Sequence, residues 1–271
     1  MADAGTIITL TTDFGTRDCY LAAMKGVILG INPGARVVDL THEIEPQNVL
    51  EGALFLKGSA AYFPPGTIHV VVVDPGVGTE RRALCVKTDE HFYIAPDNGV
   101  LSLVLAHGEL VDAVAIENSR YFRLTISPTF HGRDVFAPAA AHLSLGVQMS
   151  ELGPAVQDIV RIELPVPRAA GDGTVEAQVI HVDRFGNLIT NVDKVAWHDL
   201  TDSTDQVVVR IDVGNAVLDC ISRTYNDVPV GAPVALWGST DFLEISVNQG
   251  NAAEELGATM GDRITIRIGT R

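Results

Sequence analysis

The sequence predicts an α/β protein of two domains: an N-terminal α/β/α domain with a mostly parallel sheet, and a smaller C-terminal domain built from β-strands. Strand-like and helix-like segments alternate through the first half, which is typical of a parallel sheet with helices on both faces. After residue 174, short β-branched segments follow one another with polar turns between them, which is typical of a barrel or a sandwich. At 271 residues the chain is long enough for both domains.

The first half begins with a predicted strand at residues 6 to 12 and a helix over residues 18 to 31, whose apolar side chains recur at helical spacing. A short strand at residues 36 to 40 comes next. Pro46 is then expected to begin a second helix that reaches about residue 61, because proline is favoured in the first turn of a helix.

The central strand is predicted at residues 68 to 73, where four consecutive valines require that both faces of the strand are covered. Pro75 cannot donate a ladder hydrogen bond, so the strand ends before it. Asp74 is thereby placed at the carboxyl end of a buried strand, where ligands bind in open α/β sheets. Arg81 follows a glycine-containing loop that can fold back toward Asp74. From this stretch alone, a turn-capping aspartate and a solvated arginine explain the residues equally well.

The rest of the first half is expected to contain a hairpin, with strands at residues 84 to 87 and 92 to 95, and a helix over residues 100 to 105. His131 precedes an alanine-rich helix, and the positive end of that helix would keep its imidazole neutral. A core or capping histidine is the commoner role for such a residue.

Residues 164 to 173 are rich in proline, alanine and glycine and form the predicted linker, so the domains are expected to span residues 1–165 and 174–271. No helix is expected in the second domain. Its predicted strands lie at residues 175 to 182, 207 to 213, 234 to 237 and 264 to 268.

The composition excludes several classes of protein. The formal charge is −15, with 34 acidic and 19 basic residues, so a nucleic-acid partner is not expected. No apolar segment approaches the roughly 18 residues of a membrane span, and no signal peptide is evident, so we expect no membrane association and a cytoplasmic location. Three widely separated cysteines, Cys19, Cys85 and Cys220, are expected to be buried thiols and not disulfides or zinc ligands.

Several polar side chains are predicted in turns where strands end, namely Asp13, Asp18, Asp74, Asp97 and His131. Their pattern leaves three interpretations open. A hydrolase metal ion could be bound by Asp13, Asp18, Asp74 and His131, although their spacing matches no established ligand signature. The glycine-rich loop after Asp74 could bind phosphate, although it lacks the lysine of a P-loop. An Asp-Arg-His cluster could instead activate water, beside carboxylates that bind hydroxyls or amines.

Six motifs occur in order along the chain: TTDFGTRD (11–18), VDPGVGTERR (73–82), YIAPDNGVLS (93–102), TFHGRDVFAPAAAHL (129–143), IHVDRFGNLITN (180–191) and GSTDFLEISVNQGNAA (238–253). Together they resemble the S-adenosyl-L-methionine hydroxide adenosyltransferases, which are the water-using relatives of the fluorinases and chlorinases. The resemblance spans essentially the whole chain, linker included, and six ordered motifs are far more specific than any single one.

The resemblance implies a C-terminal β-barrel and a homotrimer, with S-adenosyl-L-methionine bound between the N-terminal domain of one subunit and the C-terminal domain of its neighbour. It implies hydrolysis to adenosine and methionine, by in-line attack of water at the ribose 5′ carbon, without metal or cofactor. Asp74, Arg81 and His131 would position and activate the water.

The resemblance also implies a set of substrate contacts. Asp13 would hold the ribose hydroxyls, since a carboxylate accepts two charge-assisted bonds from a diol. The other implied contacts are Asp18 and Asp183 to the methionine ammonium, Ser239 to its carboxylate, and Phe185, Asn187 and Tyr225 around the adenine.

The chain departs from the halide-using relatives at informative positions. Those relatives have an uncharged aromatic residue in place of Asp74 and a Tyr-Ser pair in place of His131 and Gly132. Because an aspartate beside the nucleophile repels fluoride and chloride, the sequence is predicted to use water. Thr240 replaces an arginine of the fluorinases, which leaves open how the methionine carboxylate is held. The alternative functions are a protein that binds S-adenosyl-L-methionine or adenosine with negligible turnover, and a metal-dependent phosphoesterase.

Overall fold

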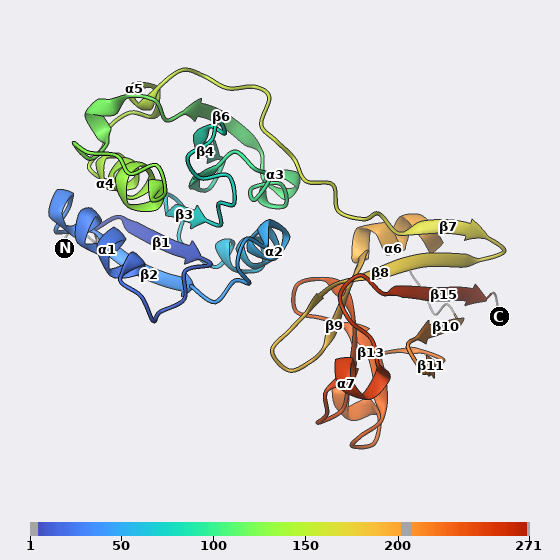
Figure 1. Cartoon of the computed structure of the whole chain (residues 1–271). Helices are drawn as coiled ribbons and strands as arrows, with labels where there is room; N and C mark the ends of the chain where they lie inside the picture. Colours follow the sequence, from blue (N-terminus) through green and yellow to red (C-terminus); the bar gives the residue numbers. More distant parts are fainter. Residues whose placement is uncertain (1–4, 202–207, 270–271) are drawn as a thin grey trace. The chain divides into compact units, whose positions relative to one another are not determined.

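The computed structural model describes residues 5–201 and 208–269. The chain divides into two compact units, Met1–Ile162 and Glu163–Arg271, and each unit has its own sheet and its own core (Figure 1). The first unit is a mixed α/β structure and the second is mainly β, so the predicted fold class is confirmed.

The sheet of the first unit has the strand order β2-β1-β3-β5-β4-β6. Its strands are β1 (Ile7–Thr12), β2 (Arg36–Thr41), β3 (Ile68–Val72), β4 (Ala83–Thr88), β5 (Phe92–Pro96) and β6 (Leu110–Ala115). β1 pairs in parallel with β2 and β3, and β3 pairs in parallel with β5. β4 runs antiparallel to both of its neighbours, so the expected hairpin is the β4–β5 pair. Because β1 and β3 are parallel neighbours, the loops that contain Asp13 and Asp74 leave the same edge of the sheet.

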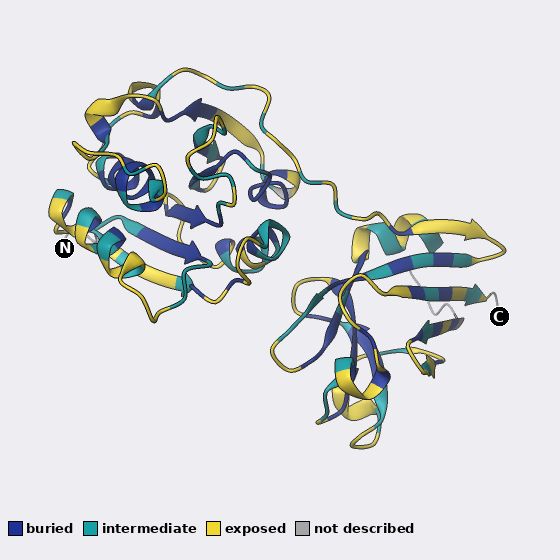
Figure 2. Cartoon of the chain, in the orientation of Figure 1, coloured by how far each residue is buried: buried dark blue, intermediate teal, exposed yellow. Residues whose placement is uncertain are grey.

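Helices cover both faces of this sheet. They are α1 (Tyr20–Ile31), α2 (Val49–Ala60), α3 (Val104–His107), α4 (Ala137–Ser144) and α5 (Met149–Leu152), with a 3-10 turn at Ser119–Tyr121 and a π-helical segment at Gly132–Phe136. Val70 and Val72 pack in one core with Phe136, whereas Val71 packs in the opposite core with Leu56. The valine run of β3 is thus buried from both sides, as predicted (Figure 2).

Two helix boundaries differ from the prediction. α2 begins at Val49 and not at Pro46, because the side chain of Asn48 caps it by accepting a hydrogen bond from the backbone N–H of Glu51 at 3.1 Å. The helix expected from residue 100 is replaced by turns up to α3. There the Ser102 hydroxyl donates to the Gly99 carbonyl at 2.6 Å.

The cysteine prediction was wrong at two positions. All three thiols are free, but Cys85 alone is buried, whereas Cys19 and Cys220 are exposed. Cys19 directly precedes α1, and Cys220 lies in the turn before a short edge strand. Burial raises the pKa of the Cys85 thiol, which keeps it protonated and inert.

The second unit contains a nine-stranded sheet with the order β11-β10-β15-β8-β9-β14-β13-β12, and β7 pairs with β8 beside this path. Its strands are β7 (Arg168–Gly171), β8 (Thr174–Val182), β9 (Leu188–Asp193), β10 (Val208–Val213), β11 (Ala216–Leu218), β12 (Ile221–Ser222), β13 (Pro233–Trp237), β14 (Phe242–Val247) and β15 (Arg263–Gly269). The four predicted strands correspond to β8, β10, β13 and β15. Residue 207, at the predicted start of the second of these, lies outside the described residues.

Three features of this unit were not predicted. The second half of the expected linker is the β7–β8 hairpin, closed by Asp172 and Gly173, both with positive φ. Helix α6 (Lys194–Thr201) buries no residue completely, and α7 (Ala252–Leu256) is too short to show a helical period. Neither could be recognised from apolar spacing.

Among the described residues, no helix has the length and hydropathy to cross a bilayer.

Candidate active site

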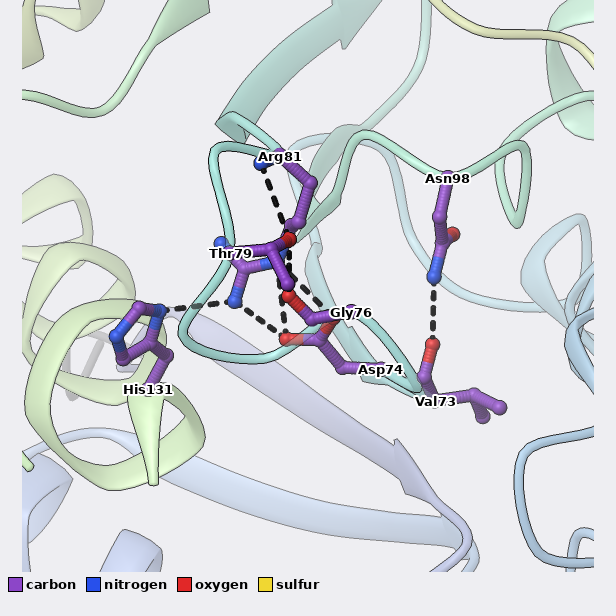
Figure 3. Close-up of polar contacts among 7 residues, drawn as sticks. All are labelled: Val73, Asp74, Gly76, Thr79, Arg81, Asn98 and His131. Atoms are coloured by element: carbon purple, nitrogen blue, oxygen red, sulfur yellow. Dashed lines mark hydrogen bonds and ion pairs between the residues drawn. The ribbon is translucent and has the colours of Figure 1, made fainter. Parts of the chain in front are cut away.

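Asp74 and Arg81 form an ion pair at the carboxyl end of β3 (Figure 3). The Arg81 Nε donates to both carboxylate oxygens of Asp74, at 2.9 and 3.1 Å, and its Nη2 also bonds Oδ2. The guanidinium lies over the Phe136 ring, 5.3 Å from its centroid. Both charged side chains are nearly enclosed, at 5% and 10% exposed, and a buried charge requires such pairing. The loop therefore does fold Arg81 back onto Asp74.

The intervening loop is a compact pair of turns. The Val77 N–H donates to the Asp74 carbonyl at 3.2 Å, and the Thr79 hydroxyl donates to the Gly76 carbonyl at 2.7 Å. Gly78 has a φ of +77°, and a Cβ at this position would lie 2.3 Å from the Pro128 carbonyl oxygen. Only glycine fits here, so this residue fixes the path that returns Arg81 to the strand end.

His131 is the third member of the cluster. Its Nδ1 lies 2.9 Å from Arg81 Nη2, so the guanidinium stands between the carboxylate and the imidazole (Figure 3). Because a guanidinium can only donate, Nδ1 must accept, and the neutral ring then has its proton on Nε2. Burial, followed by the Arg81 charge, lowers the pKa of His131 below its ordinary value. The neutral ring expected at a helix N-terminus is thus produced mainly by burial and by Arg81.

A neighbouring asparagine, Asn98, supports the cluster, although no pattern in the sequence marks it. Its Nδ2 donates to the Val73 carbonyl at 2.8 Å, directly before Asp74 (Figure 3). The adjacent Asp97, one of the polar residues that the sequence offered as candidates, instead accepts from Arg82 Nε and from the Val160 N–H, both at 2.8 Å. Asp97 therefore fixes a distant segment of the first unit and does not reach the cluster.

Asp74 and His131 line a pocket of about 300 Å³ together with Asp13. The other lining residues are Phe14, Tyr20, Pro46, Gln47, Val72, Val77, Thr129, Phe130 and Gly132. One oxygen of the Asp13 carboxylate accepts the backbone N–H of Gln47 at 2.8 Å, which leaves lone pairs for a ligand. The convergence of the loops after β1 and β3 thus brings two of the predicted carboxylates to one cavity.

One wall of this pocket is aromatic. Tyr20 and Phe130 meet edge to face with their ring centroids 5.2 Å apart, and Phe14 contacts both rings at 5.8 and 5.9 Å.

Asp18 is exposed and is not among the residues that line the pocket. The four candidate metal ligands therefore do not share one site, and both Asp74 oxygens are already bonded by Arg81. Within residues 5–201 and 208–269, no group of three His, Cys, Asp or Glu side chains is placed to hold a metal ion.

The remaining candidates lie in the second unit, where Asp183 organises the loop after β8. Its Oδ1 accepts the N–H groups of Phe185 and Asn187 at 2.8 and 2.9 Å, and its Oδ2 accepts Asn187 Nδ2 at 2.9 Å. The loop is also packed against α7, since the Ala253 N–H donates to the Gly186 carbonyl at 2.9 Å. Phe185 nevertheless remains 76% exposed at the tip of this ordered loop.

Tyr225 lies near Asp183 and is bonded to a buried glutamate that the sequence analysis also missed. The Tyr225 hydroxyl donates to Glu244 at 2.7 Å. Burial, then Glu244 and last the charge of Asp183 raise the pKa of Tyr225. Ser239 is exposed in the turn between β13 and β14. The structure therefore groups Asp13, Asp74, Arg81 and His131 in the first unit, and Asp183, Phe185, Asn187 and Tyr225 in the second.

Comparison with known proteins gives a consistent result. The family models of the N-terminal and C-terminal domains of SAM hydroxide adenosyltransferase match residues 8–153 and 177–265. An (R)-S-adenosyl-L-methionine hydrolase from Salinispora tropica is 38% identical over 97% of this chain and 98% of its own length. A fluorinase from Actinoplanes sp. is 30% identical over 71% of this chain and 74% of its own. A crystal structure of a conserved protein from Thermotoga maritima has a TM-score of 0.87 at 38% identity, covering 96% of this chain and 99% of that one.

Proposed function

The chain belongs to the S-adenosyl-L-methionine hydroxide adenosyltransferase family, and we propose that its Asp74–Arg81–His131 cluster activates the water that hydrolyses the substrate. The protein is an enzyme that converts S-adenosyl-L-methionine to adenosine and L-methionine. The observation that supports the role of the cluster is its hydrogen-bonded order, carboxylate to guanidinium to imidazole, whose two ends, Asp74 and His131, line the same pocket as Asp13.

The chemistry requires a nucleophile but no general acid. The sulfonium of the substrate departs as a neutral thioether, whereas free water has a pKa of about 15.7 and is a poor nucleophile. A carboxylate can accept the proton of water as the new C–O bond forms at the 5′ carbon. Holding the water in line behind that carbon lowers the barrier further, by proximity.

The hydrogen bonds within the cluster support a separate role for each of its members. Asp74 is the proton acceptor in this proposal, because its Oδ1 accepts one hydrogen bond, from Arg81 Nε, and keeps a lone pair for the water. Arg81 orients both neighbours. His131 has its proton on Nε2, so that nitrogen donates a hydrogen bond to the water oxygen and orients its lone pair toward carbon.

The substrate contacts follow the family pattern. Asp13 would bind the ribose diol beside the cluster, and its position in the same pocket supports this role. Asp18 and Asp183 would bind the methionine ammonium, and Ser239 its carboxylate. Phe185, Asn187 and Tyr225 would surround the adenine, and the exposure of Phe185 and Tyr225 on an ordered surface supports a ligand there.

We also propose that the enzyme is a cytoplasmic homotrimer that needs no metal or cofactor. Each substrate would lie between the first unit of one subunit and the second unit of its neighbour. Such an arrangement would bring the exposed aromatic residues of one subunit to the pocket of another, because the candidates for adenine lie in the second unit.

Incubation of chelator-treated protein with S-adenosyl-L-methionine in oxygen-18 water tests this function. Adenosine labelled at its 5′ oxygen and an equal amount of methionine are expected, since water attacks carbon. Substrate that stays intact both with and without the chelator would instead identify a binding protein with negligible turnover. Turnover that disappears with the chelator would favour a metal-dependent enzyme.

A further inference from the structure

Glu244, on β14, is a buried carboxylate without a basic partner. It is 6% exposed, and no Lys, Arg or His within residues 5–201 and 208–269 forms an ion pair with it. Its Oε1 accepts two hydroxyl hydrogen bonds, from Tyr225 and Ser246, both at 2.7 Å. Burying a carboxylate is costly even with two donors, so a residue of this kind in a strand interior needs an explanation beyond packing.

The bond to Tyr225 links Glu244 to a surface loop between β12 and β13. Tyr225 begins a 3-10 turn, Tyr225–Asp227, that is closed by a reciprocal capping box between Thr224 and Asp227. The far side of the loop is fastened to the residue after β14, since Asn248 Nδ2 donates to the Val228 carbonyl at 2.8 Å. The loop is therefore anchored at both ends of its path across β14.

The Tyr225 ring is fixed at one end and open elsewhere. Its hydroxyl is bonded to the buried Glu244, yet the residue is 40% exposed. Burial, together with the bond to Glu244, raises the pKa of the Tyr225 phenol, so it remains a donor at neutral pH. A ring that is held at its polar tip presents an ordered aromatic surface, with little rotational freedom to lose when a flat ligand stacks on it.

The turn beside Glu244 is shaped around its carboxylate. A Cβ at Gly238 would lie 2.8 Å from Glu244 Oε2, so glycine keeps the space that this oxygen occupies. The Gly238 N–H pairs with the Phe242 carbonyl at 2.9 Å, which closes the turn that contains Ser239. Glu244 is thereby held in one position between this turn and Tyr225.

We infer that Glu244 is a positioning residue for the adenine end of the substrate, which acts by fixing the ring of Tyr225 through its hydroxyl. The inference rests on the proposed function, in which Tyr225 borders the adenine. Glu244 does not touch the reacting atoms, so its removal weakens the binding of substrate and transition state equally. Such a loss appears in KM and leaves kcat unchanged.

The test compares Tyr225→Phe, Glu244→Ala and Glu244→Gln by steady-state kinetics and by calorimetric titration with adenosine and with methionine separately. Tyr225→Phe and Glu244→Ala are each expected to raise KM and the adenosine Kd roughly tenfold, the usual scale of a lost hydrogen bond to a charged group, with kcat within about twofold. Glu244→Gln keeps an acceptor for the phenol and is expected to restore most of the affinity. Methionine binding should not change in any of them.

The first unit offers a matched control, because the Tyr121 hydroxyl donates to Glu151 at 2.9 Å in the same kind of pair. Tyr121→Phe is expected to change neither KM nor the adenosine Kd. Unchanged adenosine affinity in Tyr225→Phe would overturn the inference. This outcome is decisive even if Glu244→Ala does not fold. A loss of methionine affinity in place of adenosine affinity would overturn it too, since Glu244 would then contact the ammonium.

The two proposals fail differently. If the unaltered protein binds adenosine but does not hydrolyse S-adenosyl-L-methionine, the proposed function fails while the adenosine titrations still decide the role of Glu244. If it binds no adenosine, both are overturned.

Discussion

Two aspartate–arginine pairs, built on adjacent arginines, differ in what lies beyond them. Arg81 bonds Asp74 and then His131, on the wall of a pocket. Arg82 bonds Asp97 and then Asp158, whose side chain is on the surface. The side chains of Asp74 and Asp97 are 5% and 2% exposed, so the two carboxylates are nearly equivalent in chemistry and in burial.

The difference shows that pairing alone does not identify a catalytic carboxylate. Asp97 also accepts the Val160 N–H, so both of its oxygens serve to fix the end of the first unit. Within the described residues, the Asp74 carboxylate accepts hydrogen bonds from Arg81 alone, and Asp74 lines the pocket. We therefore expect catalysis to depend on the first pair and stability on the second.

Replacement of Asp74 should have the largest effect. Asp74→Asn keeps the shape of the side chain but removes the proton acceptor, and we expect kcat to fall about 1,000-fold, within the usual range for a general base. Circular dichroism should show that the fold is kept, while the melting temperature falls because Arg81 loses its charged partner. Turnover at the level of the unaltered protein would exclude Asp74 as the base.

His131→Ala tests the third member of the Asp74–Arg81–His131 cluster and should lower kcat roughly 100-fold. Because the pKa of His131 is lowered, its neutral form persists below pH 6.5, and the acidic decline of kcat in the unaltered enzyme should lie below that pH. A decline centred at or above pH 6.5 would contradict the assignment of this titration to His131.

Asp97→Asn provides the matched comparison. It should lower the free energy of unfolding by about 1 to 3 kcal/mol, because the buried partner of Arg82 loses its charge. We expect kcat to change by less than about threefold. Thermal unfolding and steady-state kinetics measure the two effects, and a loss of kcat comparable to that of Asp74→Asn would remove the distinction between the pairs.

A second contrast, between His131 and the fully buried His69, predicts a pH effect on stability alone. Burial, and then His91, lowers the pKa of His69 to about 3. The folded state therefore resists protonation that the unfolded chain accepts near pH 6.5, so stability present above that pH is lost as the pH falls toward 3. At pH 5 the free energy of unfolding is thereby about 2 kcal/mol lower than at neutral pH.

Denaturant unfolding at pH 7 and pH 5 measures this effect, with His69→Gln as the control that should flatten the dependence. An equal dependence in His69→Gln would assign the acid sensitivity to other groups.

Much of the first unit could be predicted because local signals agreed with the tertiary structure. The valine run and Pro75 set the end of β3, and that end placed Asp74 at the correct edge of the sheet. The contacts of Arg81 and His131 could only be hypothesised, since they depend on the return path through Gly78 and on the packing of a π-helical segment. Their catalytic roles remain predictions.

The missed residues share a physical reason. Asn98 bonds a backbone carbonyl 25 positions away, and backbone groups leave no pattern in a sequence. Glu244 alternates with core residues in β14 and therefore resembles a solvent-facing strand position, whereas the loop around Tyr225 covers it. Asp97 was misjudged for the opposite reason, because a polar residue at a strand end is also suited to fix a distant loop.

The most direct test of the account is the pH dependence of adenosine formation by Asp74→Ala, measured in single turnovers with saturating substrate. If Asp74 accepts the proton of water, its loss leaves bulk hydroxide as the nucleophile. The rate of the variant should then rise about tenfold per pH unit from pH 7 to 9, while the unaltered enzyme stays nearly constant. A variant whose rate is independent of pH over this range, or equal to that of the unaltered enzyme, would contradict the central role of Asp74.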